Sequence, residues 1–158
     1  MKNILLLIVC LCLGGCYAPN GKVVQIQDAT TWWVDWRFAP SEQVILQGVM
    51  CFHNTFGGKP TTKEEELTLL AKQAVEKMVL NKRLLFQYNE KVVIPHLPNG
   101  VAVQEVLLNW GLVCLHTKSV PKEWIISEKV AQKAKLGMWA TDPPTLPISR
   151  PYNAEDLH

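Results

Sequence analysis

The sequence predicts an α+β domain in which strands come first and helices close the chain. Residues with high strand propensity form segments at 22–38, 44–52, 83–88 and 91–97. In the first of these, Val24 and Ile26 alternate with glutamines at period two. Apolar residues instead recur at helical spacing from Leu67 to about Leu80, and shorter helical patterns follow at 103–110 and from Pro121 onward. The expected order is therefore strands, helix, strands, short helix, final helix.

The composition is that of one globular domain. The chain has 158 residues, of which 48% are hydrophobic and 19% are charged. These values exclude a large multidomain enzyme, a disordered chain and a polytopic membrane protein. The formal net charge is only +2, which argues against a strongly basic nucleic-acid binder.

The first fifteen residues have the pattern of a signal peptide. Lys2 precedes an apolar run from Ile4 to Leu13, and ten helical residues span about 15 Å, too short for a hydrocarbon core of roughly 30 Å. The run ends in Leu13-Gly14-Gly15-Cys16, which resembles the lipobox of bacterial lipoproteins. The resemblance implies that residues 1–15 are removed and that Cys16 is acylated, which anchors the chain to membrane lipid. The alternative is an ordinary signal peptide with a chance cysteine.

The residue after Cys16 bears on localisation. It is Tyr17, not the aspartate that commonly retains lipoproteins in the inner membrane, so we expect the outer membrane of a two-membrane bacterium, with the protein facing the periplasm. Residues 16–22 would be the lipidated N-terminus and tether. Removing residues 1–15 takes away one of 16 basic residues and none of the 14 acidic ones, which leaves a net charge of +1.

The domain proper is expected to span 23–140, and its elements follow in order. A turn at 40–42 separates the first two strand regions, and Gly48 predicts a bulge or bend inside the second. Thr62 to Glu65 fits a capping box, so Glu64 to Glu66 indicate a helix start rather than a metal site. Gly111 ends the short helix. Four of the eleven residues from 141 to 151 are prolines, so 141–158 is expected to be an extended or disordered tail.

The final helix is predicted to begin at Pro121. One face would carry Trp124, Ala131, Ala134 and Met138.

From about Val23 to Trp139 the chain resembles the staphylococcal-nuclease-like (thermonuclease) family. The segments that carry the resemblance are 24–31, 46–49, 71–86, 97–113 and 131–139. The strongest is 97–113, Leu-Pro-Asn-Gly-Val-Ala-Val-Gln-Glu-Val-Leu-Leu-Asn-Trp-Gly-Leu-Val, which is similar to the family's turn, second helix and closing Gly-Leu-Ala. The resemblance implies a five-stranded OB-fold β-barrel with three helices.

The resemblance also implies that the catalytic residues of the family are missing here. That family holds calcium with carboxylates and stabilises the phosphoryl charge with two arginines. The two metal carboxylates fall on Thr30 and Met50, the base on His53, the first arginine on Ile45 and the second near Lys91. Asp28 stays beside the metal position. Neither a hydroxyl nor a thioether replaces a carboxylate, and 44–56 contains no Asp, Glu or Arg. We therefore expect no calcium-dependent nuclease.

No other chemistry is supported by the sequence. His53, His96 and His116 lack a short zinc spacing, and the chain has no Gly-rich phosphate loop and no Gly-x-Ser-x-Gly motif. We expect no metal and no cofactor.

Cys51 and Cys114 are the two cysteines of the mature chain besides Cys16. In an oxidising compartment they suggest one disulfide, although two separately buried thiols are an equal alternative before any fold is considered. The family resemblance places their segments side by side, and so implies a Cys51–Cys114 disulfide.

Trp32, Trp33 and Trp36 are candidate partner contacts. Strand alternation puts Trp32 and Trp36 on one face and Trp33 on the other. They either pack in the core and barrel rim or anchor a partner, because aromatic residues carry much of the energy of interfaces.

The expected function is a non-catalytic, lipid-anchored envelope protein that binds other proteins. A subunit of an outer-membrane secretion or conjugation assembly is a fitting setting. The alternatives are an OB module that binds nucleic acid or oligosaccharide, and a residual phosphodiesterase. Nucleic acid is disfavoured by the near-neutral charge.

Overall fold

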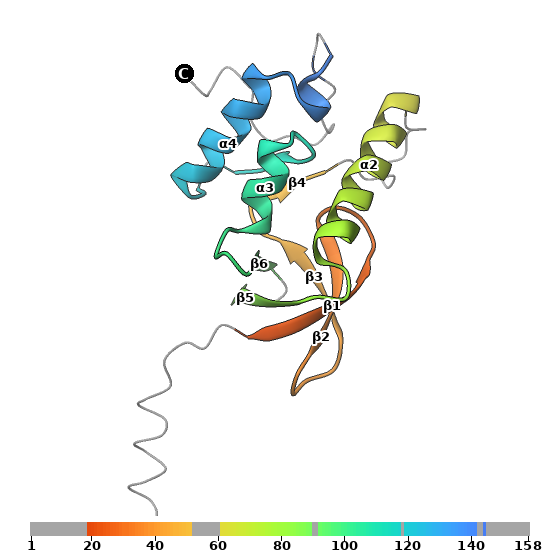
Figure 1. The fold of residues 1–158 in the computed structure, drawn as a ribbon, viewed down its shortest axis with the longest axis vertical. Helices are drawn as coiled ribbons and strands as arrows, with labels where there is room; N and C mark the ends of the chain where they lie inside the picture. The colour runs from red at the N-terminus through yellow and green to blue at the C-terminus, as the bar shows by residue number, and fades with distance from the viewer. Residues whose placement is uncertain (1–18, 52–60, 90–91, 118, 142–143, 145–158) are drawn as a thin grey trace, which may run out of the picture.

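The computed structural model describes residues 19–51, 61–89, 92–117, 119–141 and 144. The predicted signal peptide (1–15), Cys16 and nearly all of the proline-rich tail lie outside these residues. Figure 1 shows a barrel with the helices gathered toward one end. Among the described helices, none is both long and apolar enough to cross a membrane.

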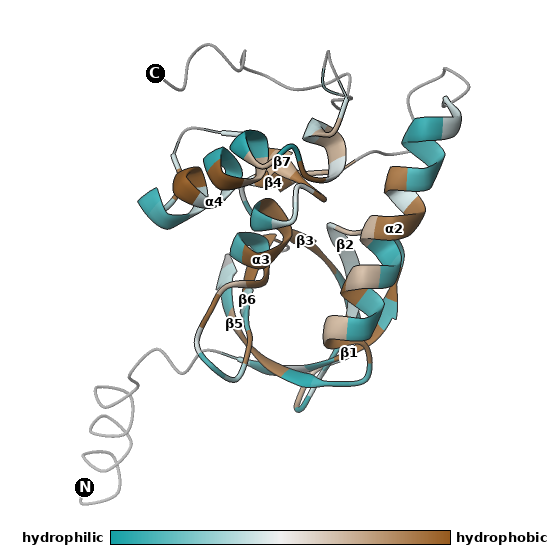
Figure 2. Cartoon of the chain, turned by 45° about the horizontal axis from the view of Figure 1, so that its top comes forward, coloured by the Kyte–Doolittle hydropathy of each residue, from teal (hydrophilic) through white to brown (hydrophobic). Residues whose placement is uncertain are grey.

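Five strands close into a barrel, as expected. They are β1 (Asn20–Ile26), β2 (Thr31–Trp36), β3 (Glu42–Leu46), β5 (Arg83–Asn89) and β6 (Val92–His96). Their order around the barrel is β1-β2-β3-β6-β5, and β5 pairs with β1 to close it. The β3–β6 pair is parallel and the other pairs are antiparallel. In its described part the protein is therefore an α+β OB-like barrel with three α-helices, and Figure 2 looks into its ring.

Gly48 divides the second predicted strand region into β3 and the short β4 (Val49–Met50). Its φ of +75° is in the left-handed region, which favours glycine because a Cβ is strained there. A Cβ at this position would also lie 2.9 Å from Cγ1 of Val120. β4 pairs with β7 (Cys114–Leu115) in a separate two-stranded sheet beside the barrel. The predicted bend is confirmed.

The long helix α2 (Thr62–Val79) starts one residue earlier than predicted. Its N-cap is Thr61, which accepts a hydrogen bond from the backbone N–H of Glu64, while the Glu64 carboxylate accepts one from the Thr61 N–H. The capping box is therefore Thr61 to Glu64 rather than Thr62 to Glu65. Repeated threonine and glutamate at 61–66 make both registers fit the sequence pattern.

The last two helices pack against each other over the barrel. α3 (Val103–Asn109) has Trp110 as its C-cap and is followed by Gly111, whose φ is +67°. α4 (Lys122–Lys133) ends earlier than predicted, because Lys135 has a φ of +51° and the backbone changes direction there. Met138 therefore lies in the 3-10 helix η1 (Gly137–Trp139) and not on α4.

Two groups of buried side chains hold these elements together. The larger fills the barrel and its contacts with α2, α3 and α4. The smaller joins β4 and β7 to α2, α4 and η1; it consists of Met50, Leu67, Cys114, Ala131, Met138 and Trp139. We call these the barrel core and the second cluster.

Candidate functional site

The turn between β1 and β2 is organised by Asp28. Its Oδ1 atom accepts hydrogen bonds from the backbone N–H of Thr30 at 2.7 Å, from that of Thr31 at 2.9 Å, and from the Thr30 hydroxyl at 3.0 Å. The Sγ atom of Cys51 lies 3.5 Å from the same oxygen and 3.4 Å from Oγ1 of Thr30. The Oδ1 atom of Asp28 therefore stabilises the turn through these hydrogen bonds. We call Asp28, Thr30 and Cys51 the turn cluster.

Burial makes the side chains of the turn cluster unreactive. Thr30 and Cys51 are each only 2% exposed. Burial, reinforced by the charge of Asp28, raises the pKa of the Cys51 thiol to about 12, against an opposing hydrogen bond from Thr30. The thiolate is the nucleophilic and metal-binding form of cysteine. Cys51 is therefore protonated and inert at neutral pH.

Of the residues matched to nuclease catalytic positions, the three that the structure describes do not come together as one site. Thr30 belongs to the turn cluster, whereas Ile45 points outward from β3 and is 49% exposed. The side chain of Met50, the other residue matched to a metal carboxylate, lies in the second cluster, and Cys51 is the residue against Thr30. His53 and Lys91 lie outside the described residues. Within the described ranges no group of three His, Cys, Asp or Glu residues could hold a metal ion.

Cys51 and Cys114 lie near each other in the fold, but both are thiols, so the structure does not contain the predicted disulfide. The register of β4 and β7 explains why. Met50 is paired with Cys114, and the two share the second cluster. Successive residues in extended chain point to opposite sides, so Cys51 faces the barrel core and turns its sulfur toward Asp28.

The three tryptophans of β2 separate as strand alternation predicts. Trp32 is fully buried, and its indole N–H donates to the carbonyl of Ala29 at 3.3 Å. It is therefore a core residue, which corrects its assignment as a partner contact. Trp33 faces outward and is 37% exposed. Trp36 is half-buried at the barrel end, with its ring centroid 5.1 Å from that of Phe86.

Trp33 lies on an apolar part of the outer barrel surface. Ile45 and Val92 are partners across the β3–β6 pair and are 49% and 38% exposed. Trp33 is opposite Gln43 on β3, two residues from Ile45, so the two side chains are diagonal neighbours on one face. We call Trp33, Ile45 and Val92 the outer apolar row.

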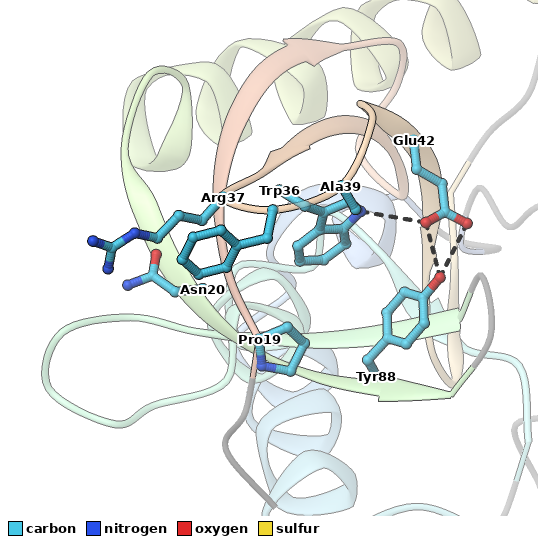
Figure 3. Close-up of a pocket in the computed structure, with 8 residues that line it drawn as sticks. Pro19, Asn20, Trp36, Arg37, Ala39, Glu42 and Tyr88 are labelled. Atoms are coloured by element: carbon cyan, nitrogen blue, oxygen red, sulfur yellow. Dashed lines mark hydrogen bonds between the residues drawn. The ribbon is translucent and has the colours of Figure 1, made fainter.

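A pocket of about 560 Å³ opens at the barrel end where β2 turns into β3. The residues that line it come from the ends of β1, β2, β3 and β5 and from the β2–β3 turn: Pro19, Asn20, Trp36, Arg37, Phe38, Ala39, Glu42 and Tyr88. Figure 3 shows the Trp36 indole at its centre, with Glu42 and Tyr88 on one side and Arg37 on the other. We call this pocket the barrel mouth.

Sequence reasoning missed the barrel mouth, although β3 contains a signal for it. Val44 and Leu46 are buried, and Glu42 has the same parity along the strand. A carboxylate is thus placed in line with the inward-facing positions. The partner that accepts this placement, Tyr88, is 46 residues away in the sequence and could not be identified by spacing.

No protein-family model matches the chain, and no curated protein matches it. The barrel architecture rests on the structure, and the resemblance to thermonucleases stays a prediction.

Proposed function

We propose that this chain is a lipid-anchored, non-catalytic, nuclease-like barrel that binds another envelope protein. The observation that carries the proposal is the outer apolar row. Aromatic and aliphatic residues that share one exposed face favour protein contact, because aromatic anchors supply much of the binding energy.

The surroundings of the row favour a protein over a polyanion. The neighbouring outward positions on β1 and β3 are glutamines, and the amide of Gln43 donates to the side-chain oxygen of Gln27. Trp33 is paired with Gln25 on one side and Gln43 on the other. Phosphate binding requires lysine or arginine, whereas the described partners of Trp33 on β1 and β3 are both glutamines.

The proposed anchor is Cys16, which would be acylated after removal of residues 1–15. Mass spectrometry of the mature protein should find a diacylglyceryl-modified N-terminal cysteine, and Cys16→Ser should abolish the modification. An unmodified wild-type chain would contradict the anchor but leave the docking surface untouched.

A matched pair of variants tests the docking surface. Ile45→Glu places a charge in the outer apolar row, and Leu69→Glu makes the same kind of change at a 56% exposed position on α2. Pull-down from solubilised envelopes should recover a stoichiometric protein with the wild type and Leu69→Glu but not with Ile45→Glu. Equal recovery by all three would refute the role of the row. A secretion or conjugation assembly is the setting we propose for the recovered protein.

A second candidate function is oligosaccharide binding. Trp33 between two glutamines offers a stacking surface flanked by amide groups, and the row lies on strands that OB folds use for oligonucleotides and oligosaccharides. Saturable quenching of tryptophan emission by an envelope oligosaccharide, lost in Trp33→Phe, would favour it. Calcium-dependent nuclease activity abolished by a chelator would overturn the non-catalytic proposal.

A further inference from the structure

The barrel mouth combines aromatic walls with one carboxylate. Trp36 and Tyr88 meet edge to face with ring centroids 5.5 Å apart, and Phe38 stands at the rim with 91% of its surface exposed. Aromatic faces attract cations through the ring quadrupole, and quaternary ammonium groups are bound in this way. The walls of the mouth are thus suited to an organic cation.

The Glu42 carboxylate is held by aromatic donors. The Tyr88 hydroxyl donates to both of its oxygens, at 2.8 and 3.0 Å, and the Trp36 indole N–H donates to Oε2 at 3.3 Å. In the described part of the chain, no lysine or arginine forms an ion pair with Glu42. A carboxylate has about four acceptor sites, so Glu42 can accept a further donor, and its negative charge favours a cationic one.

A positive group stands on the opposite side of the mouth. The Arg37 guanidinium lies 5.2 Å from the centroid of the Phe38 ring, and in Figure 3 Arg37 and Glu42 lie on either side of Trp36. Guanidinium groups match phosphate oxygens in geometry and charge. The mouth therefore offers complementary charges to both halves of a zwitterion that contains an ammonium and a phosphate.

The chain enters the fold beside this mouth. Pro19 lines the pocket, and its carbonyl accepts a hydrogen bond from the Phe86 N–H at 3.0 Å, which ties the entry to β5. Cys16 is three residues before Pro19, and three residues of extended chain reach at most roughly 11 Å. An acyl group on Cys16 would thus hold the mouth close to the membrane surface.

We propose that the barrel mouth binds the headgroup of an ammonium-bearing phospholipid. The ammonium group lies among Trp36, Tyr88 and Glu42, Arg37 contacts lipid phosphate, and Phe38 enters the membrane interface. The membrane part of this assignment rests on the proposed acylation of Cys16. Binding of the ammonium group does not, and the two can be tested apart.

The first experiment uses a soluble probe. The mature protein, labelled with 15N at its indoles, is kept in dodecyl maltoside micelles, which contain no ammonium group, and is titrated with phosphoethanolamine or with ethyl phosphate. The Trp36 indole signal, assigned with Trp36→Phe, should shift saturably with phosphoethanolamine and not with ethyl phosphate. The Trp33 signal should stay in place, because Trp33 points outward from the barrel.

Matched variants show whether Glu42 is responsible. Glu42→Gln keeps the shape of the side chain and removes its charge, so affinity for phosphoethanolamine should fall about tenfold. Glu65→Gln makes the same change at an exposed position on α2 and should bind like the wild type. Equal affinity of Glu42→Gln and the wild type, or an equal response to ethyl phosphate, would overturn the proposal.

The second experiment identifies the source of the headgroup. In nanodiscs of phosphatidylethanolamine and phosphatidylglycerol, the Trp36 signal should move to its probe-saturated position, and in phosphatidylglycerol alone it should not. Phe38→Ser should reduce the shift, whereas Leu70→Ser on α2, also an exposed apolar position, should not. A shift with the soluble probe but not with the lipid would overturn the membrane assignment. Whether Cys16 carries an acyl group is determined separately, by mass spectrometry of the mature protein.

Discussion

Replacing Cys51 with alanine should change how the free energy of unfolding depends on pH. The thiol has an ordinary pKa of 9.0 when the chain is unfolded, and the fold raises it to about 12. A native state with a raised pKa holds its proton more tightly than the unfolded state. The contribution of the Cys51 proton to the free energy of unfolding is therefore complete below pH 9 and is lost progressively as the pH rises from 9 toward 12.

The size of the effect follows from these two pKa values. Between pH 8 and pH 10 the unfolded thiol changes from mostly protonated to mostly ionised, while the native thiol stays protonated. Proton linkage then lowers the free energy of unfolding by roughly 1.4 kcal/mol over this interval. Cys51→Ala removes this term, together with a packing cost that is the same at every pH.

Urea unfolding of the mature protein under reducing conditions measures the effect. The stability advantage of the wild type over Cys51→Ala should shrink by roughly 1.4 kcal/mol from pH 8 to pH 10. Lysine and tyrosine titrations occur in both proteins and cancel in the difference. If the two stability curves run parallel, Cys51 is not a buried thiol, and the account of the turn cluster is refuted. Under non-reducing conditions, a native thiol at Cys51 should also become reactive to alkylation only after unfolding.

Three further predictions concern the frame around the site. Trp32→Ala should cost about 3–5 kcal/mol in urea unfolding, because the side chain is fully buried, whereas Trp33→Ala should cost less than about 1 kcal/mol; equal losses would contradict the strand register. Gly111→Ala should destabilise far more than Gly100→Ala by thermal unfolding, since both have positive φ but only at Gly111 would a Cβ strike backbone, with open space at Gly100. Thr61→Ala should lower stability by about 1 kcal/mol through loss of the N-cap, and no loss would show that the capping box is not formed.

The parts of the fold that sequence reasoning predicted are governed by local chemistry. The separation of Trp32 from Trp33 follows from strand alternation, and Gly48 marks a bend because its backbone needs a positive φ. The capping box was placed one residue late, since Thr61 and Thr62 both precede a glutamate by three positions. Local patterns thus predict the elements well and their ends less well.

The parts that were missed depend on which way a side chain faces in the assembled fold. Cys51 directly follows β4 and Cys114 lies in β7, the strand paired with β4, but a disulfide also needs side chains that point toward each other. The pairing of Met50 with Cys114 sends Cys51 to the other side. The barrel mouth was missed for the same reason, because it depends on Glu42 and Tyr88 meeting across the barrel.

The turn cluster and the barrel mouth differ in whether their carboxylate can accept a hydrogen bond from a ligand. In the turn cluster, Oδ1 of Asp28 already receives three hydrogen bonds from the turn that it stabilises, and the side chains beside it are buried. In the barrel mouth, Glu42 receives donors from two aromatic residues and faces a pocket open to solvent. A ligand can reach the second carboxylate without dismantling the fold, whereas it could reach the first only by displacing backbone hydrogen bonds. Any cation that this barrel binds through these groups should therefore be sought at the mouth.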